Sequence, residues 1–213
     1  MSILITGGTR GIGAAIIQRY ADLGLSAQGT SRDGSVGLSL DVTDPESVNA
    51  LGDVFADRSL DLLVCNAGVF EDRGLGFDDL TPTIWHDSFA VNVVGVAETI
   101  RVLLPALRRS DAGKVAIIAS QMGSQARAPG GSYVYRATKA AAINLGRNLA
   151  TDLRPEGIAV GIYHPGWVRT DMGGASAEIS PQEAAIGLVE RFRTLSIDST
   201  GCFETWDGQA HPL

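Results

Sequence analysis

A short apolar run that passes at once into a glycine-rich turn constrains this chain most strongly. Residues 3–5 read Ile-Leu-Ile, and residues 6–13 read TGGTRGIG. After the turn, apolar residues recur at helical spacing: Ala14, Ile16, Ile17, Tyr20, Ala21 and Leu23. The order is therefore a buried strand, a tight turn and a helix, which directs free backbone N–H groups and the positive end of the helix dipole at one point. A diphosphate fits there, because glycine places no Cβ in its path.

The glycine spacing is not by itself decisive. Gly7, Gly11 and Gly13 depart from G-x-G-x-x-G, the commonest dinucleotide fingerprint. The same turn also suits an ordinary connection between a strand and a helix. Residues further along the chain have to decide between a phosphate-binding turn and a plain loop.

Composition limits the classes of protein to consider. The chain has 213 residues, enough for one domain with a sizeable core, and its net charge of -7 disfavours nucleic-acid binding, which needs clustered Lys and Arg. His86, His164 and His211 lack metal-ligand spacing, so we expect no metal. Cys65 and Cys202 lie far apart and suggest no disulfide framework. No run reads as long enough to span a bilayer and the turn leaves no room for a targeting peptide, so we expect a cytoplasmic protein with no membrane partner.

Strand and helix patterns alternate along the whole chain. We expect strands at residues 3–6, 26–31, 37–41, 60–66, 114–120, 158–164 and 201–204. We expect helices at residues 11–23, 82–109 and 132–153, with two more starting at the Asp-Pro-Glu of residues 44–46 and the Ser-Pro-Gln-Glu of residues 180–183. Such alternation predicts one domain, residues 1–213, with a doubly wound parallel sheet and helices on both faces in three α/β/α layers. The second and third strands stand too close in sequence for a helix between them.

Ligands of an open parallel sheet bind outside the carboxyl ends of its strands. At the end of the second strand, an acid typically holds the ribose 2′-hydroxyl of NAD, whereas an arginine suits the 2′-phosphate of NADP. Here Ser31 and Arg32 occupy that place, and Arg10 in the glycine turn adds a second positive charge. Guanidinium groups form charge-assisted hydrogen bonds with phosphate, so we expect NADP(H) to be preferred over NAD(H). A solvated loop residue is the other interpretation of Arg32.

Tyr135 and Lys139 form the sharpest chemical signal. They lie four residues apart on an expected helix, so their side chains share one face. A nearby ammonium lowers the pKa of a phenol, which can then exchange a proton with a carbonyl or alcohol oxygen. Ser120, at the end of a strand, can hold the same oxygen, and Asn92 can orient a water or support Lys139. A surface pair at this spacing is common, and Tyr133 has no such partner because Ala137 stands four residues on.

The sequence resembles the short-chain dehydrogenase/reductase family. The resemblance rests, in the family's order, on the glycine turn at 6–13, Asp41-Val42, Asn66-Ala67-Gly68, Asn92-Val93-Val94-Gly95, Ser120, Tyr135-x-x-x-Lys139 and Pro165-Gly166. Within the family, the stretches 121–124 with 135–136 and 164–174 are similar to the C-factor and sniffer-type carbonyl reductase branch.

This resemblance implies a Rossmann fold, a nicotinamide cofactor and a catalytic set of Asn92, Ser120, Tyr135 and Lys139. Tyr135 would be the general acid and base, and Lys139 would also hold the nicotinamide ribose. The cofactor would lie along residues of five segments: Gly7, Thr9, Arg10, Gly11, Ile12 and Gly13; Ser31 and Arg32; Asp41 and Val42; Asn66, Ala67 and Gly68; Pro165, Gly166, Trp167, Val168 and Thr170. Trp167 and Met172 are candidates for an apolar wall beside the nicotinamide, or for a place in the core.

The expected function is hydride transfer between NADPH and a small-molecule carbonyl or secondary alcohol. A non-catalytic dinucleotide sensor, or a signalling protein like the C-factor, is the alternative; such proteins usually lack the Tyr or the Lys. An epimerase or dehydratase uses the same pair but needs a larger carboxyl-terminal region. We also expect a homodimer or homotetramer, built through the helices that carry Asn92 and Tyr135.

Overall fold

Seven parallel strands form the sheet on which the other elements pack. In the computed structural model, which describes all 213 residues, their order is β3-β2-β1-β4-β5-β6-β7. The strands are β1 (Ile3–Ile5), β2 (Ala27–Ser31), β3 (Leu38–Ser39), β4 (Leu62–Cys65), β5 (Lys114–Ile118), β6 (Ala159–His164) and β7 (Phe203–Thr205). Every neighbouring pair is parallel. The strand order reverses between β1 and β4, which is the point where ligands bind in such sheets.

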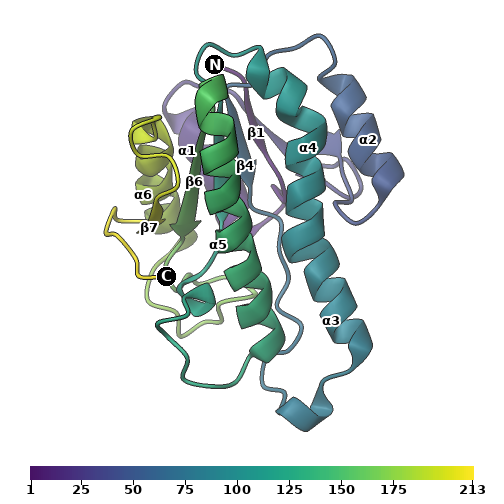
Figure 1. The fold of residues 1–213 in the computed structure, drawn as a ribbon, viewed down its shortest axis with the longest axis vertical. Coiled ribbons are helices and arrows are strands. Elements are labelled where there is room, and N and C mark those ends of the chain that lie inside the picture. Colours follow the sequence, from purple (N-terminus) through teal and green to yellow (C-terminus); the bar gives the residue numbers. More distant parts are fainter.

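Helices cover both faces of the sheet, so the expected doubly wound α/β/α fold is confirmed. They are α1 (Gly11–Asp22), α2 (Pro45–Val54), α3 (Pro82–Phe89), α4 (Gly95–Arg108), α5 (Tyr133–Leu153) and α6 (Pro181–Thr194). Short 3-10 turns are η1 (Phe77–Asp79), η3 (Gln121–Gly123) and η4 (Arg154–Glu156). Figure 1 shows α2, α4 and α5 on one face and α1 and α6 on the other. As expected, no helix stands between β2 and β3.

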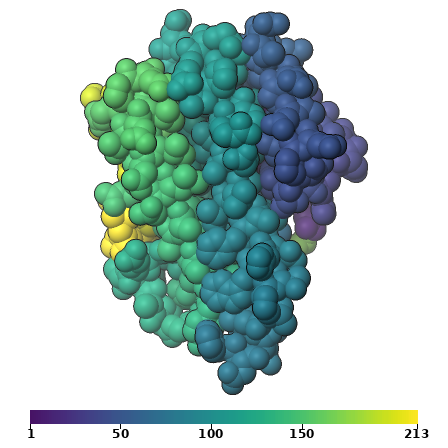
Figure 2. Space-filling model, turned by 45° about the vertical axis from the view of Figure 1, so that its right-hand side comes forward, coloured from purple at the N-terminus to yellow at the C-terminus, as the bar shows by residue number.

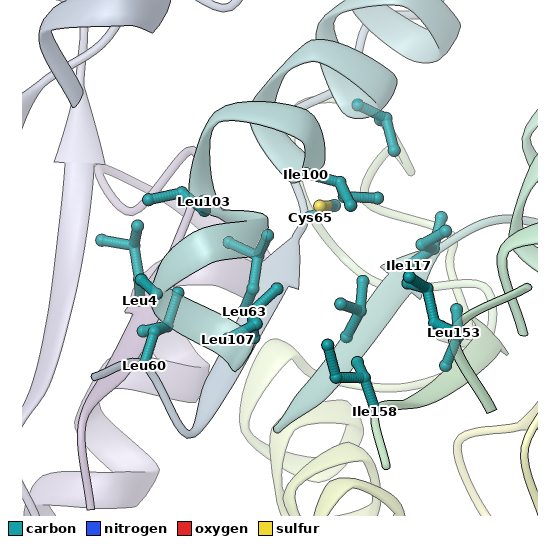
Figure 3. Close-up of a cluster of buried hydrophobic side chains, with 14 of the residues drawn as sticks. Leu4, Leu60, Leu63, Cys65, Ile100, Leu103, Leu107, Ile117, Leu153 and Ile158 are labelled. Carbon is teal, nitrogen blue, oxygen red and sulfur yellow. The ribbon is translucent and has the colours of Figure 1, made fainter. Parts of the chain in front are cut away.

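Two buried clusters join the helices to the sheet, one on each face. The larger one holds 20 residues, and Figure 3 shows Leu103 and Leu107 of α4 beside the strand residues Leu4 and Leu63. The other holds 14 residues and joins α1 and α6 to the opposite face. Burial of such side chains supplies about 1.5–3 kcal/mol each relative to exposure. These clusters fix the strand ends from which the candidate site is built.

Side-chain caps set the starts of two helices as the sequence indicates. Asp44 accepts the N–H of Glu46 at 3.1 Å before α2. Ser180 and Glu183 form a reciprocal capping box at the start of α6. Each cap satisfies backbone donors that have no partner inside the helix, and a proline at the first turn loses no hydrogen bond there.

The long helix expected at residues 82–109 is not uniform. Its α3 and α4 parts are joined by the π-helical segment η2 (Ala90–Val94), which contains Asn92. A π-bulge inserts extra backbone into a helix and is frequent at functional sites. The difference matters because this segment turns the Asn92 side chain inward, where it is 1% exposed.

The expectation that no run could span a bilayer needs correction. The segment Pro82–Arg108 is long and apolar enough to cross a membrane by length and composition, and 44% of its most apolar window is buried inside the protein. A core helix of a folded domain meets the same criteria. The buried residues Val96, Ile100, Leu103 and Leu107 of this segment belong to the larger core cluster.

Candidate active site

The carboxyl ends of the strands bring the expected polar segments to one edge of the sheet. The glycine turn follows β1, Asn66 follows β4, Ser120 lies just beyond β5, and Pro165 follows β6. In Figure 1 this edge faces the lower end of the molecule, opposite the amino terminus. The tightest part of the arrangement is the turn itself.

Thr6 and Asn66 clamp the glycine turn to the end of β4. Thr6 Oγ1 accepts the backbone N–H groups of Asn66 and Ala67, both at 3.0 Å. Asn66 Nδ2 donates to the carbonyl oxygens of Thr6 at 2.9 Å and Gly7 at 3.0 Å. The turn is so close that a Cβ on Gly13 would lie 2.2 Å from the Gly7 oxygen. The sequence indicates Asn66 as a cofactor residue; its clamping bonds, and the part of Thr6, emerge only in three dimensions.

The start of α1 presents a positive backbone surface without a local counter-charge. Arg10 is its N-cap without a side-chain cap bond, and no acidic residue stands in its first turn. The first N–H groups of the helix and its dipole are therefore not compensated by a local carboxylate. Gly7 and Gly11 take positive φ angles of 69° and 56° in the turn before it. These residues fit an anionic diphosphate, which the expected nicotinamide cofactor carries.

Two arginines stand where a 2′-phosphate is expected, and both have acidic neighbours. The Arg10 guanidinium pairs with Asp171 at 2.7 Å, and both side chains are largely exposed. Hydrogen bonds from Thr43 lower the pKa of Asp41, and the positive charge of Arg32 lowers it further. The Ser31 hydroxyl is buried and accepts the N–H of Val36 at 3.3 Å, so it holds its own loop.

Val42 and Gly95 pack closely on the side where adenine is expected. A Cβ on Gly95 would lie 2.8 Å from Val42 Cγ2. Glycine at the start of α4 therefore lets the helix approach the loop after β3.

Tyr135 is almost wholly buried at the strand edge. Its ring stacks on Phe70 with centroids 4.1 Å apart, and its hydroxyl lies 4.0 Å from the sulfur of Met172. Burial raises the pKa of Tyr135 to about 12, while a hydrogen bond with Ser120 and the charge of Arg73 act to lower it. The phenol is thus protonated at neutral pH and has Ser120 as its polar neighbour.

Lys139 is buried one helical turn further along α5. Its Nζ donates to the carbonyl oxygen of Ile118 at 3.0 Å and lies 5.7 Å from the centroid of the Tyr135 ring. Burial lowers the pKa of Lys139 to about 8. The groups that lower the pKa of Tyr135 here are Ser120 and Arg73, which differs from the expectation that Lys139 performs this task.

Asn92 uses all its polar atoms inside the protein. Its Oδ1 accepts the N–H of Val69 at 2.9 Å, and its Nδ2 donates to Val69 O at 2.9 Å and Thr138 Oγ1 at 3.0 Å. It therefore ties the loop after β4 to α5 and makes no hydrogen bond to Lys139. A Cβ on Gly68 would lie 3.2 Å from Asn92 Oδ1 and 3.5 Å from Lys139 Nζ, so glycine keeps the space between them open.

Residues 165–174, which follow β6, form a strap across this edge of the sheet. Gly166 begins it with a φ of 88°, and the Trp167 indole N–H donates to Gly173 O at 2.9 Å. Thr170 Oγ1 accepts the N–H of Gly173 at 3.0 Å. Trp167 braces the strap and is 45% exposed, whereas the side chain of Met172 reaches the Tyr135 hydroxyl.

Phe70 and Arg73 belong to the site although no sequence motif singles them out. Phe70 stacks on Tyr135, and the Arg73 guanidinium lies 5.1 Å from the Phe70 ring centroid. Arg73 also donates to the backbone oxygen of Met172 in the strap. The only available signal is their place just after Asn66-Ala67-Gly68.

The fold and this site define a dehydrogenase of the Rossmann type, and comparison with known proteins identifies the family. Residues 1–180 match the family described as short chain dehydrogenase. The chain belongs to this family. It is accordingly an oxidoreductase of a family that uses a nicotinamide cofactor and acts on carbonyl and alcohol groups.

Individual relatives support the expected branch. The C-signal of Myxococcus xanthus is 36% identical over 156 residues, which covers 72% of this chain and 92% of that protein. An NADPH-bound carbonyl reductase from chicken fatty liver superposes with a TM-score of 0.91 at 27% identity, over 100% of this chain and 98% of that one. The carbonyl reductase Sniffer of D. melanogaster gives a TM-score of 0.91 at 26% identity, over 100% and 99%. The resemblance to the C-factor and sniffer-type branch is confirmed.

Proposed function

We propose that this chain is an NADP(H)-dependent reductase that transfers hydride between the nicotinamide and a carbonyl or secondary alcohol. The observation that carries the proposal is the buried Tyr135 phenol, which has the Ser120 hydroxyl as a polar neighbour that lowers its pKa and Lys139 one helical turn away. One domain, residues 1–213, would hold both cofactor and substrate.

The four candidate catalytic residues have distinct tasks in this proposal. Tyr135 gives its proton to the carbonyl oxygen, which suits a phenol whose pKa is raised to about 12 and is protonated at neutral pH. Ser120 holds that oxygen by a hydrogen bond. Lys139 contributes positive charge to the site and holds the nicotinamide ribose, and Asn92 supports proton transfer by fixing the loop after β4 against α5. The bound cofactor supplies the hydride.

The cofactor would lie across the strand edge from the glycine turn to the strap. Its diphosphate would meet Gly7, Thr9, Arg10, Gly11, Ile12 and Gly13. The adenosine side would meet Ser31, Arg32, Asp41 and Val42, and the ribose and nicotinamide would meet Asn66, Ala67, Gly68, Tyr135, Lys139, Pro165, Gly166, Trp167, Val168 and Thr170. The uncompensated start of α1 supports the first of these placements.

Preference for NADP(H) rests on Arg10 and Arg32, two cations near the expected 2′-phosphate. The chicken carbonyl reductase to which the chain is similar is described as NADPH-bound. Titration of the protein with NADPH and with NADH tests this preference. We expect the smaller dissociation constant for NADPH; equal constants would refute the preference.

Turnover of a carbonyl panel tests the catalytic part. NADPH oxidation is followed with aldehydes, ketones, diketones and quinones, for the wild-type protein and for Tyr135→Phe. We expect turnover by the wild type alone, with NADPH binding kept in both. Tight NADPH binding without turnover of any compound would favour the sensor or signalling alternative, which the likeness to C-signal raises.

We also propose a homodimer or homotetramer in the cytoplasm. Figure 2 shows α4 and α5 side by side on one broad face of the molecule. Ala142 is buried in the larger core cluster, and a Cβ on Gly146 would lie 2.6 Å from Ile162 Cγ1, so both face the sheet. Ala140 and Ala141 remain half-buried and available for a partner helix. A monomer mass by light scattering would reject the oligomer.

A further inference from the structure

The short segment after β4 from Phe70 to Arg73 contacts the start of α5 through Phe70 and Asp72. Phe70 stacks on the Tyr135 ring, and the Arg73 guanidinium lies 5.1 Å from the centroid of the Phe70 ring and lowers the pKa of Tyr135. Between them stands Asp72, whose side chain is 1% exposed. A buried carboxylate next to a candidate catalytic residue calls for a physical reason, because burying a charge without partners is costly.

Asp72 provides the cap that α5 lacks locally. Ser132 precedes the helix with a left-handed φ of 49° and makes no side-chain cap bond, and the first turn contains no acid. The two carboxylate oxygens of Asp72 each accept one backbone N–H, Oδ2 from Val134 at 2.8 Å and Oδ1 from Tyr135 at 3.1 Å. The cap therefore comes from a segment more than sixty residues earlier in the chain, as the separations of 62 and 63 show. Such bonds are charge-assisted, and the helix dipole strengthens them.

One of the two capped donors is the backbone N–H of Tyr135 itself. The backbone of this residue is held by Asp72 and its ring by Phe70, which lies two residues away from Asp72 in the same segment. A second tether joins the same loop to α5 through Asn92 and Thr138. The Thr138 hydroxyl in turn donates to Tyr135 O at 2.8 Å. Backbone and ring are thus fixed by one short segment.

From this geometry we propose that Asp72 is a positioning residue for Tyr135. It sets the height and rotation of the first turn of α5 so that the phenol meets the Ser120 hydroxyl, and it acts without touching substrate or cofactor. The inference rests on the proposed function, since it assigns a task relative to the catalytic phenol. Neutral amides cannot replace the carboxylate: asparagine offers one acceptor oxygen for two N–H groups and turns its own donors toward the second.

The test compares Asp72→Asn with a matched control, Asp61→Asn. Asp61 also accepts one hydrogen bond at each oxygen, from Ser2 N at 2.7 Å and Ser110 Oγ at 2.6 Å, but it lies before β4 at the opposite edge of the sheet. Steady-state kcat and KM are measured for both variants, with NADPH dissociation constants and melting temperatures. Because a displacement of about 1 Å can cost 10²-fold in rate, we expect kcat of Asp72→Asn to fall about 10- to 100-fold. KM and the NADPH dissociation constant should change less than about twofold, and Asp61→Asn should keep its kcat.

Several outcomes would overturn the inference. A kcat for Asp72→Asn equal to that of the control would do so. An Asp72→Asn variant that changes only the NADPH dissociation constant, with kcat kept, would overturn it as well. If neither Asp72→Asn nor Asp72→Ser folds, the carboxylate serves the fold and not Tyr135 in particular. Tyr135→Phe in the same assay separates this failure from that of the proposed function: wild-type activity in Tyr135→Phe rejects the function itself, whereas an inactive Tyr135→Phe beside an unimpaired Asp72→Asn rejects only the task of Asp72.

Discussion

Replacing His164 with glutamine is expected to make the free energy of unfolding less sensitive to acid. His164 ends β6, is 8% exposed, and its Nδ1 has no hydrogen-bond partner. Burial lowers the pKa of its imidazole to about 4 from the usual 6.5, the charges of His211 and Arg127 act in the same direction, and Asp207 opposes them. The protonated imidazole has no favourable place in the native structure.

The magnitude follows from the difference between the two pKa values. Between pH 6.5 and about 4 the unfolded chain binds a proton at His164 and the native chain does not, so the free energy of unfolding falls as the pH falls. Above pH 6.5 both states carry a neutral imidazole and the penalty vanishes. At 1.36 kcal/mol per pKa unit, the change from 6.5 to about 4 corresponds to about 3 kcal/mol. That is a large part of the free energy of unfolding of a folded domain, which is typically about 5–15 kcal/mol.

Urea unfolding followed by fluorescence at several pH values between 7.5 and 4 measures this effect. Over this pH range, the free energy of unfolding of the wild type and of His86→Gln, a control on α3, should fall by about 3 kcal/mol more than that of His164→Gln. An equal dependence of the free energy of unfolding on pH in the wild type and in His164→Gln would contradict the reasoning. An NMR titration that gives the His164 imidazole a pKa near 6.5 would contradict it as well.

Three further variants test the cofactor edge and the phenol. Gly13→Ala places a Cβ 2.2 Å from a backbone oxygen of the glycine turn, so calorimetry should show weaker NADPH binding, and the free energy of unfolding should fall by about 1–3 kcal/mol because of the strain; unchanged binding would contradict the close packing. Asp171→Asn frees Arg10 from an exposed ion pair worth at most about 1 kcal/mol, so NADPH should bind up to about fivefold more tightly while NADH binding stays constant; a parallel change for both would contradict this. Arg73→Gln removes a charge that lowers the pKa of Tyr135, so the rise in the rate of alcohol oxidation with pH, which follows deprotonation of the phenol, should move to higher pH; a move to lower pH would refute the assignment.

The sequence predicts well whatever depends on neighbours along the chain. The order of strand, glycine turn and helix comes from local pattern, and Tyr135 shares a face with Lys139 because both lie on one helix. Parallel strands also bring their carboxyl ends together, which places Ser120 near Asn66 without knowledge of side chains. These parts of the fold and of the candidate site need no tertiary detail.

Contacts between distant segments are what the sequence does not disclose. Asp72 caps α5 across 62 residues, and no spacing rule connects it with Val134. The π-helical segment that turns Asn92 inward has the same apolar pattern as an α-helix, so periodicity predicts one continuous helix. The pKa of Tyr135 depends on burial and on Arg73, both of which are tertiary properties.

The most direct test of the central claim compares Tyr135→Phe with Tyr133→Phe. Tyr133 lies two residues earlier on the same helix, is 40% exposed, and contacts Phe77 instead of the candidate site. Single-turnover oxidation of bound NADPH by a carbonyl substrate of the wild type is measured beside NADPH affinity. The account predicts that Tyr135→Phe binds NADPH but loses at least about 10²-fold in rate, as expected for removal of a general acid, while Tyr133→Phe keeps both. Comparable rates in the two variants would contradict the assignment of Tyr135 as the proton donor.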